Sequence, residues 1–202
     1  TIREPKHTKG GVLETFDVVL ANPPFSLKNW GMDEAKADAY GRFAYGIPPK
    51  SYGDLAFVEH MIASLNSKGR MATVLPHGVL FRGSSEGKIR TAILKDDLVE
   101  AVIGLPQNIF YGTGIPAAIL VINKDKAEDR VGKVLFIDAS NGFVKDGNKN
   151  KLRDEDIEKI VSTFDKFESV EKYAEVVESK VIEDNDFNLN ISRYVDTTEE
   201  EE

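Results

Sequence analysis

The apolar residues of this 202-residue chain gather into short runs that are rich in β-branched side chains. Runs of this length and composition, bounded by turn residues, predict buried strands. Five such strands are predicted, at residues 16–21, 70–75, 98–105, 115–123 and 133–137. The first of them ends at Asn22-Pro23-Pro24, where the prolines prevent a central strand from continuing.

Between and after the strands, apolar residues recur every three or four positions, a spacing that places them on one face of a helix. This spacing predicts helices at residues 54–67, 86–94 and 154–177. Gly69 follows the first helix and suits the left-handed position after a helix. Residues 187–191 instead alternate apolar and polar, which is typical of a strand. Residues 26–52 are rich in glycine, proline and aromatic residues, which indicates a long loop.

The order of these elements predicts the fold class. Strands that alternate with helices form a parallel α/β sheet with right-handed crossovers. Only about nine residues separate the strands at 98–105 and 115–123, which is too few for a helical crossover. We therefore expect an α/β fold whose sheet is mostly parallel but carries one late antiparallel strand.

Candidate chemistry lies at Asn22-Pro23-Pro24-Phe25, directly after the first strand. Ligands of open α/β sheets bind beyond the carboxyl ends of the strands, so a reacting group would lie here. The side-chain oxygen of Asn22 and the carbonyl oxygen of Pro23 can both accept hydrogen bonds, and the proline rings hold the backbone in place beforehand. Phe25 offers a ring face on which a base can stack, worth about 1–3 kcal/mol. An isolated Asn-Pro is usually only a turn signal, but the second proline and the ring favour a catalytic site.

Two acceptors placed in this way suit the methylation of an amine on an aromatic ring. The lone pair of the exocyclic amine of adenine is delocalised into the ring, which makes the amine a poor nucleophile. Acceptors aimed at its two N–H bonds pull the nitrogen towards tetrahedral geometry and localise the lone pair for attack on a methyl sulfonium. The base must first leave the duplex, because its amine is otherwise paired. We therefore predict that Asn22, Pro23, Pro24 and Phe25 are catalytic.

Composition narrows the possibilities further. Apolar residues make up 41% of the chain, which is enough for a core, and the absence of cysteine excludes disulfides and thiolate metal sites. No histidine spacing indicates a metal site, and no apolar run or leader indicates a membrane span or export, so a cytoplasmic protein is expected. Residues 171–202 hold 11 Asp and Glu against 3 Lys and Arg, which accounts for the whole net charge of −8. Residues 197–202 are expected to form a disordered acidic tail.

Several stretches resemble the modification subunits of type I restriction–modification enzymes, which are adenine-N6-specific DNA methyltransferases. Asn22-Pro23-Pro24-Phe25 is similar to the catalytic motif of amino-methyltransferases, and phenylalanine in its fourth place favours adenine. The longer resemblance is carried by residues 16–21, 69–82, 105–116, 134–140 and 185–194. It extends over residues 12–196, which is nearly all of the chain.

This resemblance implies a Rossmann-like, S-adenosylmethionine-dependent methyltransferase sheet. It also implies double-stranded DNA as substrate, a specificity subunit and a restriction (motor) subunit as partners. The family binds S-adenosylmethionine with a glycine-rich loop after an earlier strand, and residues 1–15 contain no such loop. We therefore expect residues 1–145 to be the target-base half of a catalytic domain whose N-terminal half is missing. Residues 146–196 are expected to be a C-terminal helix and docking segment.

The missing half leads to two further expectations. The fragment alone is expected not to methylate DNA. The strand at residues 16–21 is expected to be an apolar sheet edge, and such edges invite pairing with another chain, so self-association is expected.

Other residues are candidates for binding DNA. Phe110 and Tyr111 follow the third strand, and the family places an aromatic residue from this region, for which we choose Phe110, against the flipped base, with packing in the core as the alternative. Phosphate contacts are proposed for four basic residues, with ordinary surface charge as the alternative: Lys28, Arg82, Lys88 and Arg90. The loop at 26–52, with Trp30, is expected to be mobile and to order over DNA. His77 is expected to make a loop hydrogen bond.

Two other functions stay open at this point. One is an amino-methyltransferase that acts on protein glutamine or RNA guanine, against which Phe25 and the flanking resemblance argue. The other is a non-catalytic module that serves only in assembly. A methyl-acceptor assay separates the first from DNA methylation, and an Asn22→Ala change separates the second.

Overall fold

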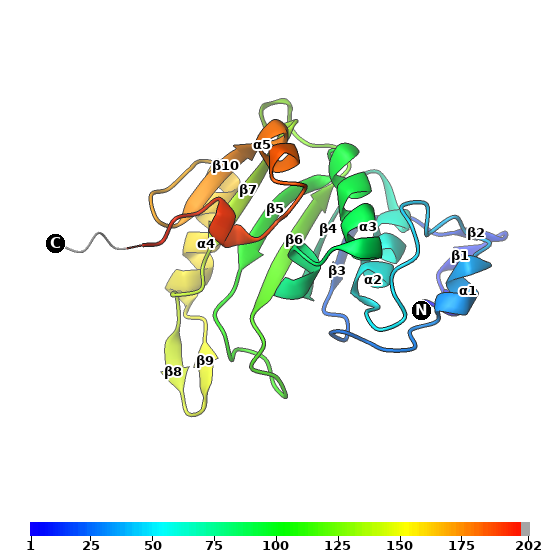
Figure 1. The fold of residues 1–202 in the computed structure, drawn as a ribbon, viewed down its shortest axis with the longest axis horizontal. Coiled ribbons are helices and arrows are strands. Elements are labelled where there is room, and N and C mark those ends of the chain that lie inside the picture. Colours follow the sequence, from blue (N-terminus) through cyan, green and yellow to red (C-terminus); the bar gives the residue numbers. More distant parts are fainter. Residues whose placement is uncertain (199–202) are drawn as a thin grey trace.

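The computed structural model describes residues 1–198, and its centre is a six-stranded sheet in the order β10-β7-β5-β6-β4-β3 (Figure 1). The strands are β3 (Phe16–Ala21), β4 (Leu65–Pro76), β5 (Val99–Gly104), β6 (Ala117–Asn123), β7 (Lys133–Asp138) and β10 (Ala174–Glu178). β3 pairs parallel with β4, and β5 with β7, whereas β6 lies antiparallel between β4 and β5. The predicted α/β sheet with a late antiparallel strand is confirmed, and β10 adds a second antiparallel strand beside β7.

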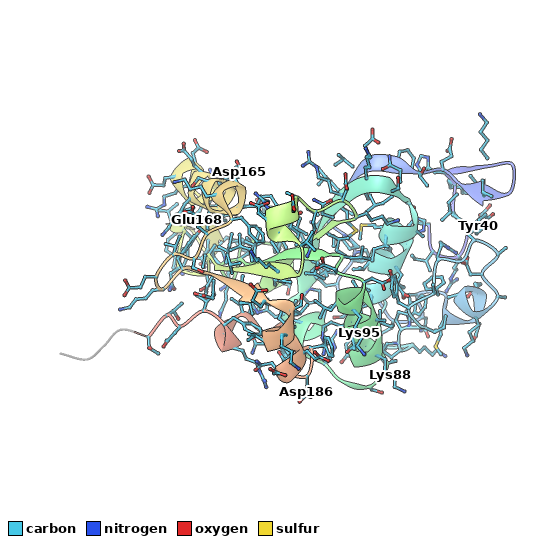
Figure 2. All side chains as sticks on the ribbon, turned by 90° about the horizontal axis from the view of Figure 1, so that it is seen from above. Tyr40, Lys88, Lys95, Asp165, Glu168 and Asp186 are labelled. Carbon is cyan, nitrogen blue, oxygen red and sulfur yellow. The ribbon has the colours of Figure 1, made fainter. Side chains whose placement is uncertain are left out.

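Helices cover the two faces of this sheet unequally. α2 (Asp54–Ala63), α3 (Ser84–Lys95) and α5 (Ser179–Asp184) lie on one face, over a core that contains Ile122 and Phe136. α4 (Asp154–Lys166) lies on the other face and packs on β5 and β7 through Ile160. Figure 2 shows α4 and α3 on opposite sides of the sheet. Beside α4 the sheet is open as a groove of about 810 Å³, lined among others by Val18, Leu20, Ala72, Ile119, Val121 and Val161.

Two short hairpins and several short helical segments lie outside the sheet. β1 (Thr8–Lys9) and β2 (Val12–Leu13) form one hairpin, and β8 (Val144–Asp146) and β9 (Lys149–Lys151) form another. The remaining helical segments are α1 (Met32–Lys36) and three 3₁₀ turns at His77–Leu80, Glu128–Arg130 and Ile191–Arg193. Among residues 1–198, no helix has the length and apolarity that crossing a membrane requires.

The structure corrects three of the sequence predictions. The helix at 154–177 ends at Lys166, because Phe167 adopts a left-handed conformation (φ 52°), and the chain then forms β10. Gly69 does not follow a helix, since α2 ends at Ala63 and Gly69 lies inside β4. Residues 187–191 form no strand, because Asp186 and Phe187 are both left-handed (φ 55°) and a 3₁₀ turn follows.

The segment after residue 145 is joined closely to the sheet. α4 covers one of its faces and β10 extends it by a strand, so the boundary expected near residue 145 divides one continuous sheet. Residues 197 and 198 are exposed and lie outside regular structure. The remainder of the predicted acidic tail, residues 199–202, lies outside the described residues.

β3 is an edge strand, as predicted. Its side chains are unusually exposed for an apolar strand: Val18 is 52% exposed and Leu20 is 75% exposed. Its pairing with β4 is irregular at the start, since Phe16 pairs with Leu65 but Val18 pairs with Arg70. Beyond this irregularity the register is regular up to Ala21, which fixes the direction in which the chain leaves the sheet.

Candidate active site

The Asn22-Pro23-Pro24-Phe25 motif follows the carboxyl end of β3. β5 runs in the same direction and ends on the same side of the sheet. Ala21, the last residue of β3, is held beside Thr73 of β4. Pro23 is buried and anchors the motif, whereas the side chain of Asn22 is exposed and accessible to a substrate. Phe25 is half-buried. The predicted acceptor side chain therefore faces solvent at the end of a rigid strand.

The ring of Phe25 meets the ring of Phe110. Their centroids lie 5.9 Å apart and their planes cross at 74°, an edge-to-face contact. Phe110 belongs to the loop at residues 105–116, which follows β5, and β5 runs in the same direction as β3. The two rings predicted to flank a base are thus brought together, while Tyr111 is 95% exposed and lies outside this contact.

The turn after Phe25 is held by Asp54, which the sequence pattern marked only as the start of a helix. The backbone N–H of Ser26 donates to Oδ1 of Asp54 at 2.8 Å, and Ser26 has a left-handed backbone (φ 50°). Asp54 is only 1% exposed in the first turn of α2. Burial raises the pKa of Asp54, and the Ser26 N–H and the charge of Arg82 partly offset that effect. The spacing of apolar and polar residues does not predict this contact between Asp54 and Ser26.

Arg82 completes a buried network under the motif. Its Nη2 lies 3.4 Å from Oδ2 of Asp54, and its Nε donates to Oε2 of Glu86 at 2.6 Å. Its guanidinium carbon also lies 4.0 Å from the centre of the Tyr52 ring. A Cβ at Gly78 would lie 1.9 Å from Nη1 of Arg82, so a side chain there would require the guanidinium to shift. Arg82 therefore has internal partners, but its side chain is 25% exposed, and the phosphate contact expected of it stays a prediction.

Arg90 is likewise internal. It is 7% exposed and donates to the backbone carbonyls of Val79, Arg82 and Phe187. These bonds use Nε and Nη1 and join α3 to the segment after α5, and the phosphate contact expected of Arg90 stays a prediction. Lys28 and Lys88 are exposed and keep their predicted availability for DNA, and Figure 2 shows Lys88 on the outer side of α3.

The loop at residues 26–52 has a small core of its own. Trp30 is 3% exposed and packs with Ile2, Ala35 and Ala56. Its indole Nε1 donates to the carbonyl of Pro49 at 2.9 Å, and a Cβ at Gly53 would lie 2.7 Å from the Trp30 side chain. This packing differs from the mobile, DNA-facing loop that the sequence suggested, because Trp30 is used to fold the loop.

His77 joins two strands. Its backbone N–H donates to Pro116, and its Nε2 lies 3.1 Å from the carbonyl oxygen of Ala117, at the start of β6. Burial lowers the pKa of His77. A neutral ring that donates from Nε2 fits this contact, and it is the loop hydrogen bond expected from the sequence.

The described residues do not form the cofactor half of a methyltransferase site. Gly10 and Gly11 make the turn of the β1–β2 hairpin, and Gly112 and Gly114 lie in the loop at 105–116. Within residues 1–198, no glycine-rich turn joins a strand to a helix in the manner of a dinucleotide loop. The same residues contain no group of three or more His, Cys, Asp and Glu that could hold a metal ion.

Comparison with known proteins identifies relatives over the whole chain. The family profile described as N-6 DNA Methylase matches residues 1–202. The MjaVII methylase subunit of a type I restriction enzyme from Methanocaldococcus jannaschii is 39% identical, over 100% of this chain and 36% of the relative. The HindI methylase subunit from Haemophilus influenzae is 36% identical, over 98% of this chain and 45% of the relative.

A solved structure agrees with these sequence matches. The crystal structure of the type I restriction–modification system methyltransferase subunit from Streptococcus thermophilus superimposes with a TM-score of 0.89 at 42% identity. It covers 98% of this chain and 41% of that protein. The chain therefore spans less than half the length of these relatives, and its segment includes the strand, the motif and the loop described above.

Proposed function

This chain belongs to the N-6 DNA methylase family, and we propose that it receives the target adenine in a type I modification subunit that methylates adenine N6 in DNA. The observation that carries the proposal is the meeting of Phe25 and Phe110 at 5.9 Å beside the exposed Asn22. An acceptor next to two aromatic rings suits a flipped base whose amine must be activated. A role in assembly alone does not explain why Asn22, Phe25 and Phe110 lie together beyond the carboxyl ends of the strands, where ligands of such sheets bind.

The residues of this chain would act on the base alone. The amide oxygen of Asn22 and the carbonyl oxygen of Pro23 accept hydrogen bonds from the two N–H groups of the amine, which localises the nitrogen lone pair. Phe25 and Phe110 hold the ring plane. S-adenosylmethionine is the methyl donor that we propose from the family. Because the described residues do not form its site, we assign them no step that involves the donor.

The partners that we propose follow from the family resemblance. Double-stranded DNA is the substrate, and a specificity subunit and a restriction subunit complete the assembly of such systems. Lys28 and Lys88 are the exposed candidates for phosphate contact. The apolar edge of β3 is a candidate site for pairing with another chain, including a second copy of this one.

An Asn22→Ala change tests this function in the full-length protein that contains this chain, assembled with its partners. Transfer of tritiated methyl groups to DNA is expected to fall by about 100-fold or more, as it does when one preorganised transition-state contact is lost. Asn141→Ala, which also truncates an exposed asparagine, is the matched control and is expected to be silent.

Three results would contradict the proposal. Methylation that is retained with Asn22→Ala would favour the assembly role. Label that enters protein glutamine or RNA rather than DNA would favour the other amino-methyltransferases. Equal losses in the two asparagine variants would show that the effect is not specific to the motif.

A further inference from the structure

The β8–β9 hairpin extends from the same edge of the sheet as the loop at residues 105–116 (Figure 1). Its two strands are short and mostly exposed, and they pair only with each other. Such a hairpin is marginally stable by itself. Its contacts with the neighbouring loop therefore decide what it does.

The loop beside it carries Phe110 and has no helix or strand of its own. Asn108 is left-handed (φ 57°), and so is Gly112 (φ 77°). A Cβ at Gly114 would lie 2.7 Å from Oδ1 of Asn108, so the loop is tightly folded there. A segment of this kind needs partners for its backbone carbonyl groups.

Two residues of β9 provide those partners. Nζ of Lys149 donates to the carbonyl of Phe110 at 2.8 Å and lies 3.4 Å from that of Thr113. The side-chain Nδ2 of Asn150 donates to the carbonyl of Gln107 at 2.7 Å, and the backbone N–H of Asn150 donates to the carbonyl of Asn108 at 3.0 Å. Four carbonyls between residues 107 and 113 therefore face donors from one short strand.

The hydrogen bonds between β9 and the loop are made by residues that are at least partly buried. Asn150 is only 6% exposed although it lies in a two-stranded hairpin. Lys149 is half-buried, whereas Lys145 of β8, which pairs with Asn150, is exposed and lies near the ring of Phe143 instead. A charged amine that points inward to a carbonyl makes a charge-assisted bond, which is stronger than a neutral one.

We propose that the β8–β9 hairpin is the positioning element for Phe110, and that Lys149 and Asn150 are its positioning residues. Their bonds fix the loop backbone at Phe110 itself and on both sides of it, so they set where its ring meets Phe25. This inference rests on the proposed function for its effect on methylation. Its structural part stands independently of that function.

A Lys149→Met change tests the structural part in the chain as described. Chymotrypsin cleavage after Tyr111, which is 95% exposed, is expected to accelerate about tenfold as the loop loosens. In protein labelled with 4-fluorophenylalanine, the ¹⁹F signals of Phe25 and Phe110 are expected to shift while the other Phe signals stay in place. Lys145→Met loses the same charge from the same hairpin and is expected to change neither measurement.

Asn150→Ala is a second variant with the same expected direction. It removes the bond to Gln107 without changing the charge. If both Lys149→Met and Asn150→Ala leave the cleavage rate and the two ¹⁹F signals unchanged, the hairpin does not position Phe110 and the inference is wrong.

The functional part is measured in the full-length protein with its partners. Lys149→Met is expected to lower kcat for DNA methylation about tenfold with little change in KM for S-adenosylmethionine. A loosened loop with unchanged kcat would overturn the positioning role. Asn22→Ala keeps the two inferences apart, because it is expected to lower methylation by about 100-fold or more but to leave the ¹⁹F signal of Phe110 in place. If Asn22→Ala retains methylation, the proposed function fails while the structural test still stands.

Discussion

Replacing Asp54 is expected to weaken methylation although Asp54 touches no substrate. Its carboxylate is the acceptor for the N–H of Ser26, one residue after Phe25, at 2.8 Å. Asp54→Ala leaves this N–H without its partner at a left-handed residue. Hydrogen bonds to charged groups contribute about 1.5–3 kcal/mol. If that cost falls on the catalytic turn, methylation falls by about 10- to 100-fold.

Arg82 adds little to this cost. It lies 3.4 Å from Asp54 but keeps two closer contacts with Glu86, at 2.6 and 3.0 Å. Asp54→Asn therefore separates the two effects, because its side-chain oxygen still accepts from Ser26 while the charge facing Arg82 is lost. We expect Asp54→Asn to keep most of the methylation activity that Asp54→Ala loses.

The assay compares the initial rate of DNA methylation with the urea midpoint of unfolding for both variants and for Glu86→Gln. Glu86→Gln weakens the hold on Arg82 without touching Ser26 and controls for damage to the network. Equal rates for Asp54→Ala and Asp54→Asn would refute the reasoning, since the Ser26 bond would then have no role. A loss of rate in Glu86→Gln as large as in Asp54→Ala would point to general instability instead.

Three further outcomes are expected. Glu59 is 1% exposed, and burial raises its pKa from 4.5 to about 8 against a smaller opposing effect of the backbone N–H groups of Tyr45 and Gly46. The folded chain then holds a proton that the unfolded chain releases, so the free energy of unfolding falls as pH rises from 4.5 to about 8, by up to about 1.4 kcal/mol per pH unit. Urea titrations should show that Glu59→Gln removes this fall, and parallel pH profiles would contradict the assignment. Leu20→Lys on the edge of β3 is expected to suppress self-association in sedimentation measurements, and unchanged sedimentation of a self-associating chain would place the contact elsewhere. Lys28→Ala is expected to weaken DNA binding and to reduce its salt dependence by about one counterion, whereas an unchanged salt slope would leave Lys28 as ordinary surface charge.

The sheet was predictable because most of its strands are short apolar runs in the sequence. The prediction for residues 16–21 matches β3, and the short link before β6 was enough to predict its antiparallel pairing. The region after Lys166 was not predictable in the same way. Residues 170–177 have apolar positions that suit either a helix or a strand, and the left-handed turn at Phe167 decides between them.

The site was predictable as far as strand direction determines it. Because β3 and β5 run the same way, Phe25 and Phe110 had to leave the sheet at one edge. The supporting residues depend instead on contacts between distant segments. Asp54 lies 28 residues from Ser26, and Lys149 lies 39 residues from Phe110, so no local spacing relates them. The internal partners of Arg82 and Arg90 were not predictable for the same reason, since charge alone does not reveal them.

The contact between the two rings also indicates which part of the site must move. A flat base between Phe25 and Phe110 needs two layers of carbon contact, or about 7 Å between parallel rings. The rings are 5.9 Å apart and cross at 74°, so both their separation and their angle must change before a base can lie between them. The backbone of Phe110 is held by Lys149, and the turn after Phe25 is held by Asp54. We therefore expect movement of the two side chains, rather than of the supported backbone, to admit the base.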